Sequence, residues 1–268
     1  MSHAATVFLF TFGVFLGMLL FLEIGRRIGI RRLQDDSGDA AEGIGAVDGA
    51  VFAVLGLLIA FTFSGATARF DTRRQLIVEE TNDIGTAYLR LDLLPADSQP
   101  ALREAFRSYL DARIETYRSF PDIAAVRKWF GAANELQRQI WRQAVDAVRI
   151  DGALPSAPML LLPALNAMID ITTTRALATQ MHPPRVVFVM LFGLALGASL
   201  LAGYGMTGSK IRSRFHMLGF AFVMATAIFV ILDLEYPRLG LIRVDAFDQA
   251  LVDLRESMNR DVPGTEPK

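Results

Sequence analysis

The sequence predicts an all-α integral membrane protein with four transmembrane helices and a helical domain between the second and third. The chain has 268 residues, 52% of them hydrophobic, and a mean hydropathy of +0.35. Its apolar residues gather in four blocks, each close to the roughly 20 residues that a helix needs to cross a bilayer. Between these blocks apolar residues recur at helical spacing, and no segment shows the alternation of a strand.

We expect the transmembrane helices at residues 4–24, 46–68, 185–207 and 215–234. We expect the first block to be a retained helix rather than a cleaved signal peptide, because no basic residue precedes it and Arg26 and Arg27 follow it. We therefore expect a multi-pass protein of the cell (inner) membrane, with the lipid bilayer as its surroundings.

The remaining residues form an extramembrane helical domain at 69–184 and a C-terminal tail with a short helix at 235–268. Apolar residues recur every seven positions after the second span, at Phe70, Ile77, Ile84 and Leu91. This spacing places them on one helix face and predicts that the second span continues out of the membrane until Pro95.

Composition excludes several classes of function. A net charge of -1 and scattered basic residues make a nucleic-acid partner improbable. The chain has no cysteine, its three histidines lack ligand spacing, and no motif for catalysis is present. We predict no catalytic residue, no metal site, no cofactor and no enzyme activity.

One stripe of the second span carries Ala53, Leu57 and Phe61 at spacing four. In a ring of helices such apolar side chains form a constriction that gates by dewetting. Periodicity alone does not separate this reading from contact with lipid or a neighbouring helix. Small residues at the same spacing, such as Gly193 and Gly197, favour close helix packing or an oligomer.

Four charged residues stand at the exit of the second span: Arg69, Asp71, Arg73 and Arg74. They fit either side chains that snorkel to the membrane surface or a charged pore mouth. The same two readings, solvated helix charges or a charged vestibule, apply to Glu79, Glu80 and Asp83 further along the helix.

The stretch from Leu57 to Arg74 resembles the second-helix signature of the bestrophin anion channels. In that family a GF or AF pair precedes an arginine-aromatic-aromatic motif at the membrane exit. Ala60-Phe61 and Arg69-Phe70 hold these positions here, and Asp71 replaces the second aromatic residue. After the fourth span, the segment from Glu235 to Gly240 resembles the family's E-x-P-F-G element without its phenylalanine.

The whole chain is similar to a bacterial branch, the bestrophin-like DUF4239 proteins. The similarity rests on Gly45 to Gly49, on Arg73-Arg74-Gln75 and on Pro237 to Ile242. The likeness to the bestrophin channels implies a homopentamer that conducts small inorganic ions, in particular anions, through a pore lined by the second helices. The hydrophobic neck would consist of Ala53, Leu57 and Phe61.

The resemblance also implies that the helical domain lies in the cytoplasm. The positive-inside rule does not decide this orientation, because equal numbers of basic residues lie near the membrane on both sides, although the short loops tilt the balance slightly toward an external helical domain. Calcium gating is not implied, since Asp233, Glu235 and Asp245 are too sparse for the calcium clasp of animal bestrophins.

Two functions remain open. The first is an oligomeric anion-conducting channel with its neck at Leu57 and Phe61. The alternative is a membrane-anchored helical sensor or scaffold that conducts nothing, whose helical domain forms an antiparallel bundle and which is a monomer or dimer.

Overall fold

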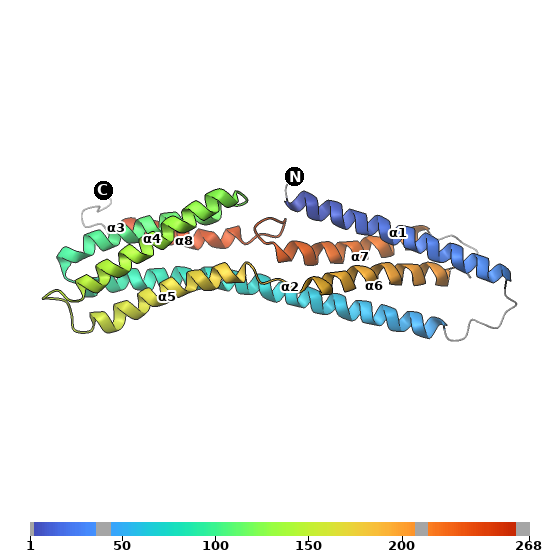
Figure 1. The fold of residues 1–268 in the computed structure, drawn as a ribbon, viewed down its shortest axis with the longest axis horizontal. Helices are drawn as coiled ribbons and strands as arrows, with labels where there is room; N and C mark the ends of the chain where they lie inside the picture. Colours follow the sequence, from blue (N-terminus) through green and yellow to red (C-terminus); the bar gives the residue numbers. More distant parts are fainter. Residues whose placement is uncertain (1–2, 36–43, 207–213, 261–268) are drawn as a thin grey trace. The chain divides into compact units, whose positions relative to one another are not determined.

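The computed structural model describes residues 3–35, 44–206 and 214–260, and in these residues the chain forms helices and no strand (Figure 1). Four helices are long and apolar enough to cross a membrane. The predicted all-α fold with four such helices is confirmed. The last residue of the predicted third span, Thr207, and the end of the tail, 261–268, lie outside the described residues.

The described residues form the α-helices α1 (His3–Asp35), α2 (Ile44–Leu89), α3 (Gln99–Arg118), α4 (Ile123–Ala147), α5 (Ala157–Ala178), α6 (Arg185–Gly205), α7 (Arg214–Glu235) and α8 (Gln249–Arg260). Short 3-10 turns occupy Arg90–Leu93, Ala96–Ser98 and Asp245–Asp248. Helix α2 therefore ends at Leu89, where the backbone tightens into the first 3-10 turn, a little before the predicted stop at Pro95.

The chain divides into two compact units. Unit 1 comprises Met1–Phe70 and His182–Ile242, and unit 2 comprises Asp71–Met181 and Arg243–Lys268. The segment predicted as a separate tail is thus shared between them, with residues from Arg243 onward in unit 2. The reason is that α8 is amphipathic and buries Leu251 and Met258 in the core of unit 2.

Unit 1 is held together by α1, which packs against α6 and α7 around Met18, Leu22, Leu191 and Ile228. The closest approach is between α1 and α6. A Cβ atom on Gly25 would collide with the carbonyl oxygen of Leu200, and one on Gly203 would collide with that of Leu22. Gly193 and Gly197 meet nothing within 4 Å. The helices of one chain therefore meet at glycines other than the pair that the spacing of four singled out.

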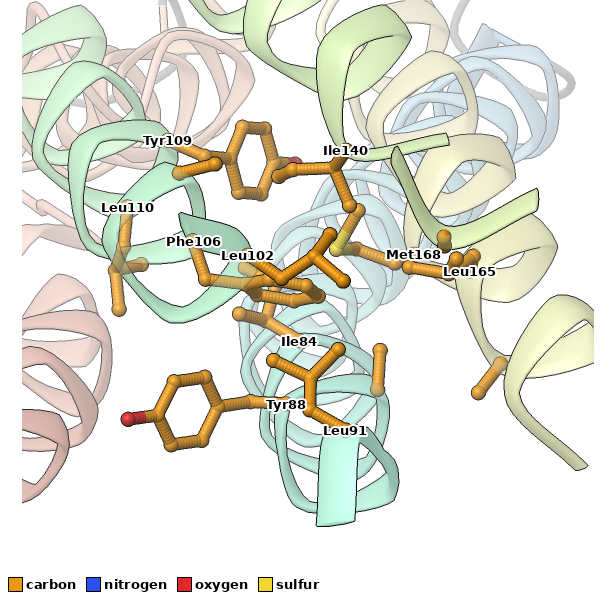
Figure 2. Close-up of a cluster of buried hydrophobic side chains, with 14 of the residues drawn as sticks. Ile84, Tyr88, Leu91, Leu102, Phe106, Tyr109, Leu110, Ile140, Leu165 and Met168 are labelled. Carbon is orange, nitrogen blue, oxygen red and sulfur yellow. The ribbon is translucent and has the colours of Figure 1, made fainter. Parts of the chain in front are cut away.

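Unit 2 has a core to which α2, α3, α4, α5 and α8 contribute, and part of it is shown in Figure 2. Ile84 and Tyr88 of α2 face Phe106 of α3, and Ile140 and Met168 come from α4 and α5. The predicted sevenfold spacing describes this face well, since Ile77, Ile84 and Leu91 are all buried.

Candidate ion pathway along helix α2

Helix α2 has one buried side within unit 1. Leu55, Thr62 and Ala66 point into the core of the unit, and Leu58 and Ile59 pack partly against it. Since each residue turns a helix by about 100°, the residues two positions from Leu55 lie on the opposite side.

This opposite side is exposed and carries small side chains. The residues on it that lie almost opposite Leu55 are Ala46, Ala50, Ala53, Leu57, Ala60, Ser64 and Ala68. Leu57 is the one large side chain among them and is 54% exposed. Phe61, one turn later at the edge of the stripe, is 66% exposed. The structure thus places the three predicted neck residues on the uncovered side of α2.

The outward side of α1 is different, because it presents large apolar residues such as Phe8, Phe12, Leu16 and Leu20. These suit contact with lipid tails. Small residues are typical of surfaces where helices approach other helices. In its most apolar window α2 has only 11% of its residues buried, against 22–39% in the other three helices. Helix α2 is therefore the span with the least cover from its own chain and with a surface poorly suited to lipid.

The membrane exit of α2 is fixed by Glu235 at the end of α7. The Glu235 side chain is 1% exposed and accepts hydrogen bonds from Arg69, whose Nε lies 3.1 Å from Oε1. His182 Nδ1 lies 3.2 Å from Oε2 of the same carboxylate, and the His182 ring stacks on Tyr236. A buried carboxylate such as that of Glu235 needs charged or hydrogen-bonding partners. The ion pair therefore joins the Arg69-Phe70 motif at the end of the second span to the E-x-P element that begins at Glu235.

The turn after α7 is closed by Asp233. Its carboxylate accepts the backbone N–H groups of Leu241 at 2.9 Å and Ile242 at 2.7 Å. A Cβ atom on Gly240 would collide with this carboxylate, so a larger residue there would force the Asp233 side chain to shift. The segment from Glu235 to Gly240 is therefore a structural element that anchors the end of α7.

The predicted pore-mouth charges differ in exposure. Arg69 is paired with Glu235, as described above. Arg73 is 7% exposed and donates to the carbonyl oxygens of Ala178, the last residue of α5, and of Met181, just after that helix. Asp71 and Arg74 pair at 3.0 Å, with side chains 50% and 40% exposed. Arg73 thus has a role in unit 2, whereas Asp71 and Arg74 stay accessible to solvent and ions.

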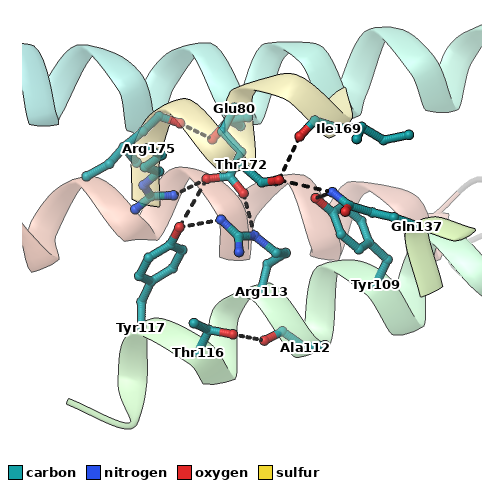
Figure 3. A network of polar contacts seen from close by, with 12 residues as sticks. Glu80, Tyr109, Ala112, Arg113, Thr116, Tyr117, Gln137, Ile169, Thr172 and Arg175 are labelled. Atoms are coloured by element: carbon teal, nitrogen blue, oxygen red, sulfur yellow. Dashed lines mark hydrogen bonds and ion pairs between the residues drawn. The ribbon is translucent and has the colours of Figure 1, made fainter. Parts of the chain in front are cut away.

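A buried ionic network lies in unit 2, shown in Figure 3. The Glu80 side chain is 0% exposed and accepts hydrogen bonds from Arg113, at 2.6 Å, and from Arg175. Arg175 also donates to Asp248 at 2.8 Å. Burial alone would raise the pKa of the Glu80 carboxyl, but the two guanidinium groups outweigh it and lower that pKa to about 2.

The expectation that Glu80 is solvated or lines a vestibule was wrong. Glu80 follows Ile77 by three positions and precedes Ile84 by four, so it belongs to the same buried face. That spacing was the signal in the sequence. Its two cationic partners come from α3 and α5, far along the chain, and no local pattern points to them.

The family model of the bestrophin-like domain matches residues 5–246 of the chain. The chain belongs to the bestrophin-like family. This confirms the resemblance seen in α2 and after α7. Together with its four apolar helices, membership identifies the chain as a membrane protein.

Solved structures share the fold of this bestrophin-like chain. A bacterial bestrophin homologue from Klebsiella pneumoniae is 16% identical, with a TM-score of 0.67 over 92% of this chain and 99% of that one. A point mutant of a bestrophin homologue from the same organism is 15% identical, with a TM-score of 0.69 over 92% and 98% of the two chains. No protein of curated function matches the sequence significantly.

The four acidic residues between positions 233 and 248 of this bestrophin-like chain, at the end of α7 and just after it, all have partners. Asp233 binds backbone N–H groups, Glu235 binds Arg69, Asp245 pairs with Arg243, and Asp248 pairs with Arg175. Across residues 3–35, 44–206 and 214–260, no group of three or more potential metal ligands comes together. The arrangement of these carboxylates does not resemble a cation-binding clasp.

Proposed function

We propose that this bestrophin-like chain assembles into a homo-oligomeric ion channel whose pore is lined by α2. The observation that supports this is the exposed side of α2, where small residues surround Leu57 and Phe61 and nothing in the described part of unit 1 covers them. In a symmetric ring the same side of each α2 faces the axis. Leu57 and Phe61 then form the narrowest apolar ring, and Ala53 leaves a wider level next to it.

A neck of this kind can gate ion flow by dewetting: when the apolar constriction is narrow, water is expelled from it and ions cannot pass. Residues 49–68 of α2 are uncharged, and Asp48, the one acid of the predicted span 46–68, lies on the same side of the helix as the buried Leu55, so the exposed side carries no acid that would repel anions. The resemblance to bestrophin anion channels makes chloride the ion to test first. Asp71 and Arg74 are the accessible charges of the proposed pore mouth.

The first experiment measures chloride flux through the purified protein in liposomes, after its mass has been determined in detergent. We expect flux together with a particle of five times the 29.5 kDa of one chain. A monomeric or dimeric particle without flux for any small ion would overturn the channel.

Substitutions at the neck make the test specific. Leu57→Ala and Phe61→Ala should raise single-channel conductance severalfold, because smaller side chains widen the apolar ring, and Ala53→Leu should lower it. Leu20→Ala, on the outward side of α1, is the matched control, since Leu20 is equally apolar and exposed in the chain. Neck variants that conduct like the wild type would contradict this placement of the neck.

Ligand sensing by unit 2 is the second candidate, and one observation favours it. A hollow of about 810 Å³ lies between α4 and α5, within the size range of small-molecule sites. Polar and aromatic side chains line it, among them Asn134, Trp141, Arg142, Asn166 and Thr173. Absence of flux in liposomes, combined with a small particle, would favour this function.

A further inference from the structure

The part of α2 that belongs to unit 2 has two unlike sides. Ile77, Glu80, Ile84 and Tyr88 are buried on one side. The exposed residues Thr72, Gln75, Glu79, Asn82 and Thr86 follow one another at alternating spacings of three and four. This is the spacing of a single seam along a helix. We call these five residues the polar seam.

The polar seam has a distinctive composition. Its side chains are hydroxyls, amides and one carboxylate, and it contains neither lysine nor arginine. A surface helix of a bundle usually displays mixed charges on its solvent side. A seam of uncharged polar groups with one acid is suited instead to a water-filled space through which ions pass.

Glu79 is the charged member of this seam. In the part of the chain that the structure describes, no ion pair joins its carboxylate to a cation. Three other exposed acids of unit 2 are paired: Glu104 with Arg107, Asp111 with Arg255 and Glu135 with Arg138. Within the described residues the exposed Asp97, Asp146 and Asp170 also lack an ion pair, so what sets Glu79 apart is its place in the polar seam. Glu79 is thus an accessible carboxylate whose field is not compensated by a neighbouring cation.

The neighbouring Asp83 is consistent with a negative potential along this part of α2. Its pKa is raised above the ordinary value by partial burial first, and then by the negative charges of Glu79 and Glu80. The Glu80 charge is compensated by two arginines, which leaves Glu79 as the main uncompensated charge nearby.

We infer that Glu79 determines the charge preference of the ion pathway outside the membrane, lowering the permeability of chloride relative to potassium. The inference rests on the proposed channel, in which each subunit contributes one α2 to the pathway. A symmetric assembly then places a ring of Glu79 carboxylates around the axis. Such a ring attracts small cations and repels anions. Selectivity would therefore be set at Glu79, whereas the uncharged neck sets conductance.

The experiment measures reversal potentials of purified protein in planar bilayers under a KCl gradient. Glu79→Gln should raise the ratio of chloride to potassium permeability severalfold, and Glu79→Lys should raise it further. Asn82→Asp adds a carboxylate to the same seam and should shift the ratio in the opposite direction. Glu104→Gln removes an exposed acid from α3 and should leave the ratio unchanged.

Ionic strength provides a second readout. The difference between the wild type and Glu79→Gln should shrink in molar salt, because the screening length falls from about 10 Å at 0.1 M to about 3 Å at 1 M. Wild-type currents with reversal potentials that do not change in Glu79→Gln, Glu79→Lys or Asn82→Asp would overturn the inference and leave the channel in place. A wild-type protein without current would overturn both.

Discussion

Glu79 and Glu80 are adjacent in sequence but have opposite environments. A step of 100° along the helix turns Glu79 to solvent and Glu80 into the core of unit 2. A buried carboxylate is tolerated only when it is paired and hydrogen-bonded, and Arg113, Arg175 and Tyr117 fulfil this condition. Removing the carboxylate leaves two buried guanidinium groups without their shared partner.

Glu80→Ala should therefore destabilise the protein by about 3–5 kcal/mol, the usual cost of breaking a buried ion pair on one side. Unfolding can be followed in detergent by tryptophan fluorescence, since Trp129 and Trp141, the chain's two tryptophans, both lie on α4 of unit 2. Glu79→Ala is the matched control, and as an exposed substitution it should change stability by no more than about 0.5 kcal/mol.

The same measurement should depend on pH in the wild type. Folding lowers the pKa of Glu80 from 4.5 to about 2. The ionised carboxylate therefore makes its full contribution to the free energy of unfolding at pH values above the pKa of the unfolded chain. That contribution, about 3 kcal/mol, is lost as the pH falls from about 4.5 toward about 2. Glu80→Ala should lack this component. Equal loss of stability in both proteins over this range would show that other groups account for the acid sensitivity.

At the scale of the element, helix faces could be predicted where local spacing determines them. The sevenfold repeat of Ile77, Ile84 and Leu91 identified the buried side of α2 correctly. The pairing of Glu80 with Arg113 and Arg175 was not predictable, because it depends on which distant helices pack against that side. The glycine contacts were missed for a similar reason, since a spacing of four within one helix does not identify the partner helix.

The crossing of α1 and α6 provides a test of the glycine assignment. Gly203→Ala should sharply reduce the yield of folded protein, because its Cβ would collide with backbone atoms of Leu22, which cannot move aside as a side chain does. Gly197→Ala, on the same helix, meets nothing within 4 Å and should be tolerated. Size-exclusion profiles and melting temperatures in detergent give the comparison. Equal behaviour of the two variants would argue against this crossing.

At the scale of the whole molecule, the fold class could be predicted because membrane spans depend on local composition and length. The docking of α8 in unit 2 could not, since an amphipathic helix of this length has many possible partners. The neck at Ala53, Leu57 and Phe61 stays a prediction for a different reason. Its function depends on neighbouring subunits, and a single chain shows only that this side of α2 is uncovered.

Sidedness is the remaining property of the whole molecule, and the lack of native cysteine makes it testable. The family resemblance places unit 2 in the cytoplasm, whereas the numbers of basic residues near the two membrane surfaces are equal and do not decide the orientation. Single cysteines would be introduced by Ser156→Cys, at an exposed position before α5, and by Ser209→Cys, which lies outside the described residues between α6 and α7.

Helix α6 separates these two positions, so one of them faces the outside of an intact cell. We expect a charged maleimide, which does not cross the bilayer, to label Ser209→Cys in intact cells and Ser156→Cys only after permeabilisation. Ser199→Cys, at a position buried inside unit 1, is the control for nonspecific reaction. Labelling of Ser156→Cys but not of Ser209→Cys in intact cells would reverse the orientation. The polar seam of α2 would then lie on the outer side of the membrane, and the Glu79 carboxylates would face the extracellular solution rather than the cytoplasm.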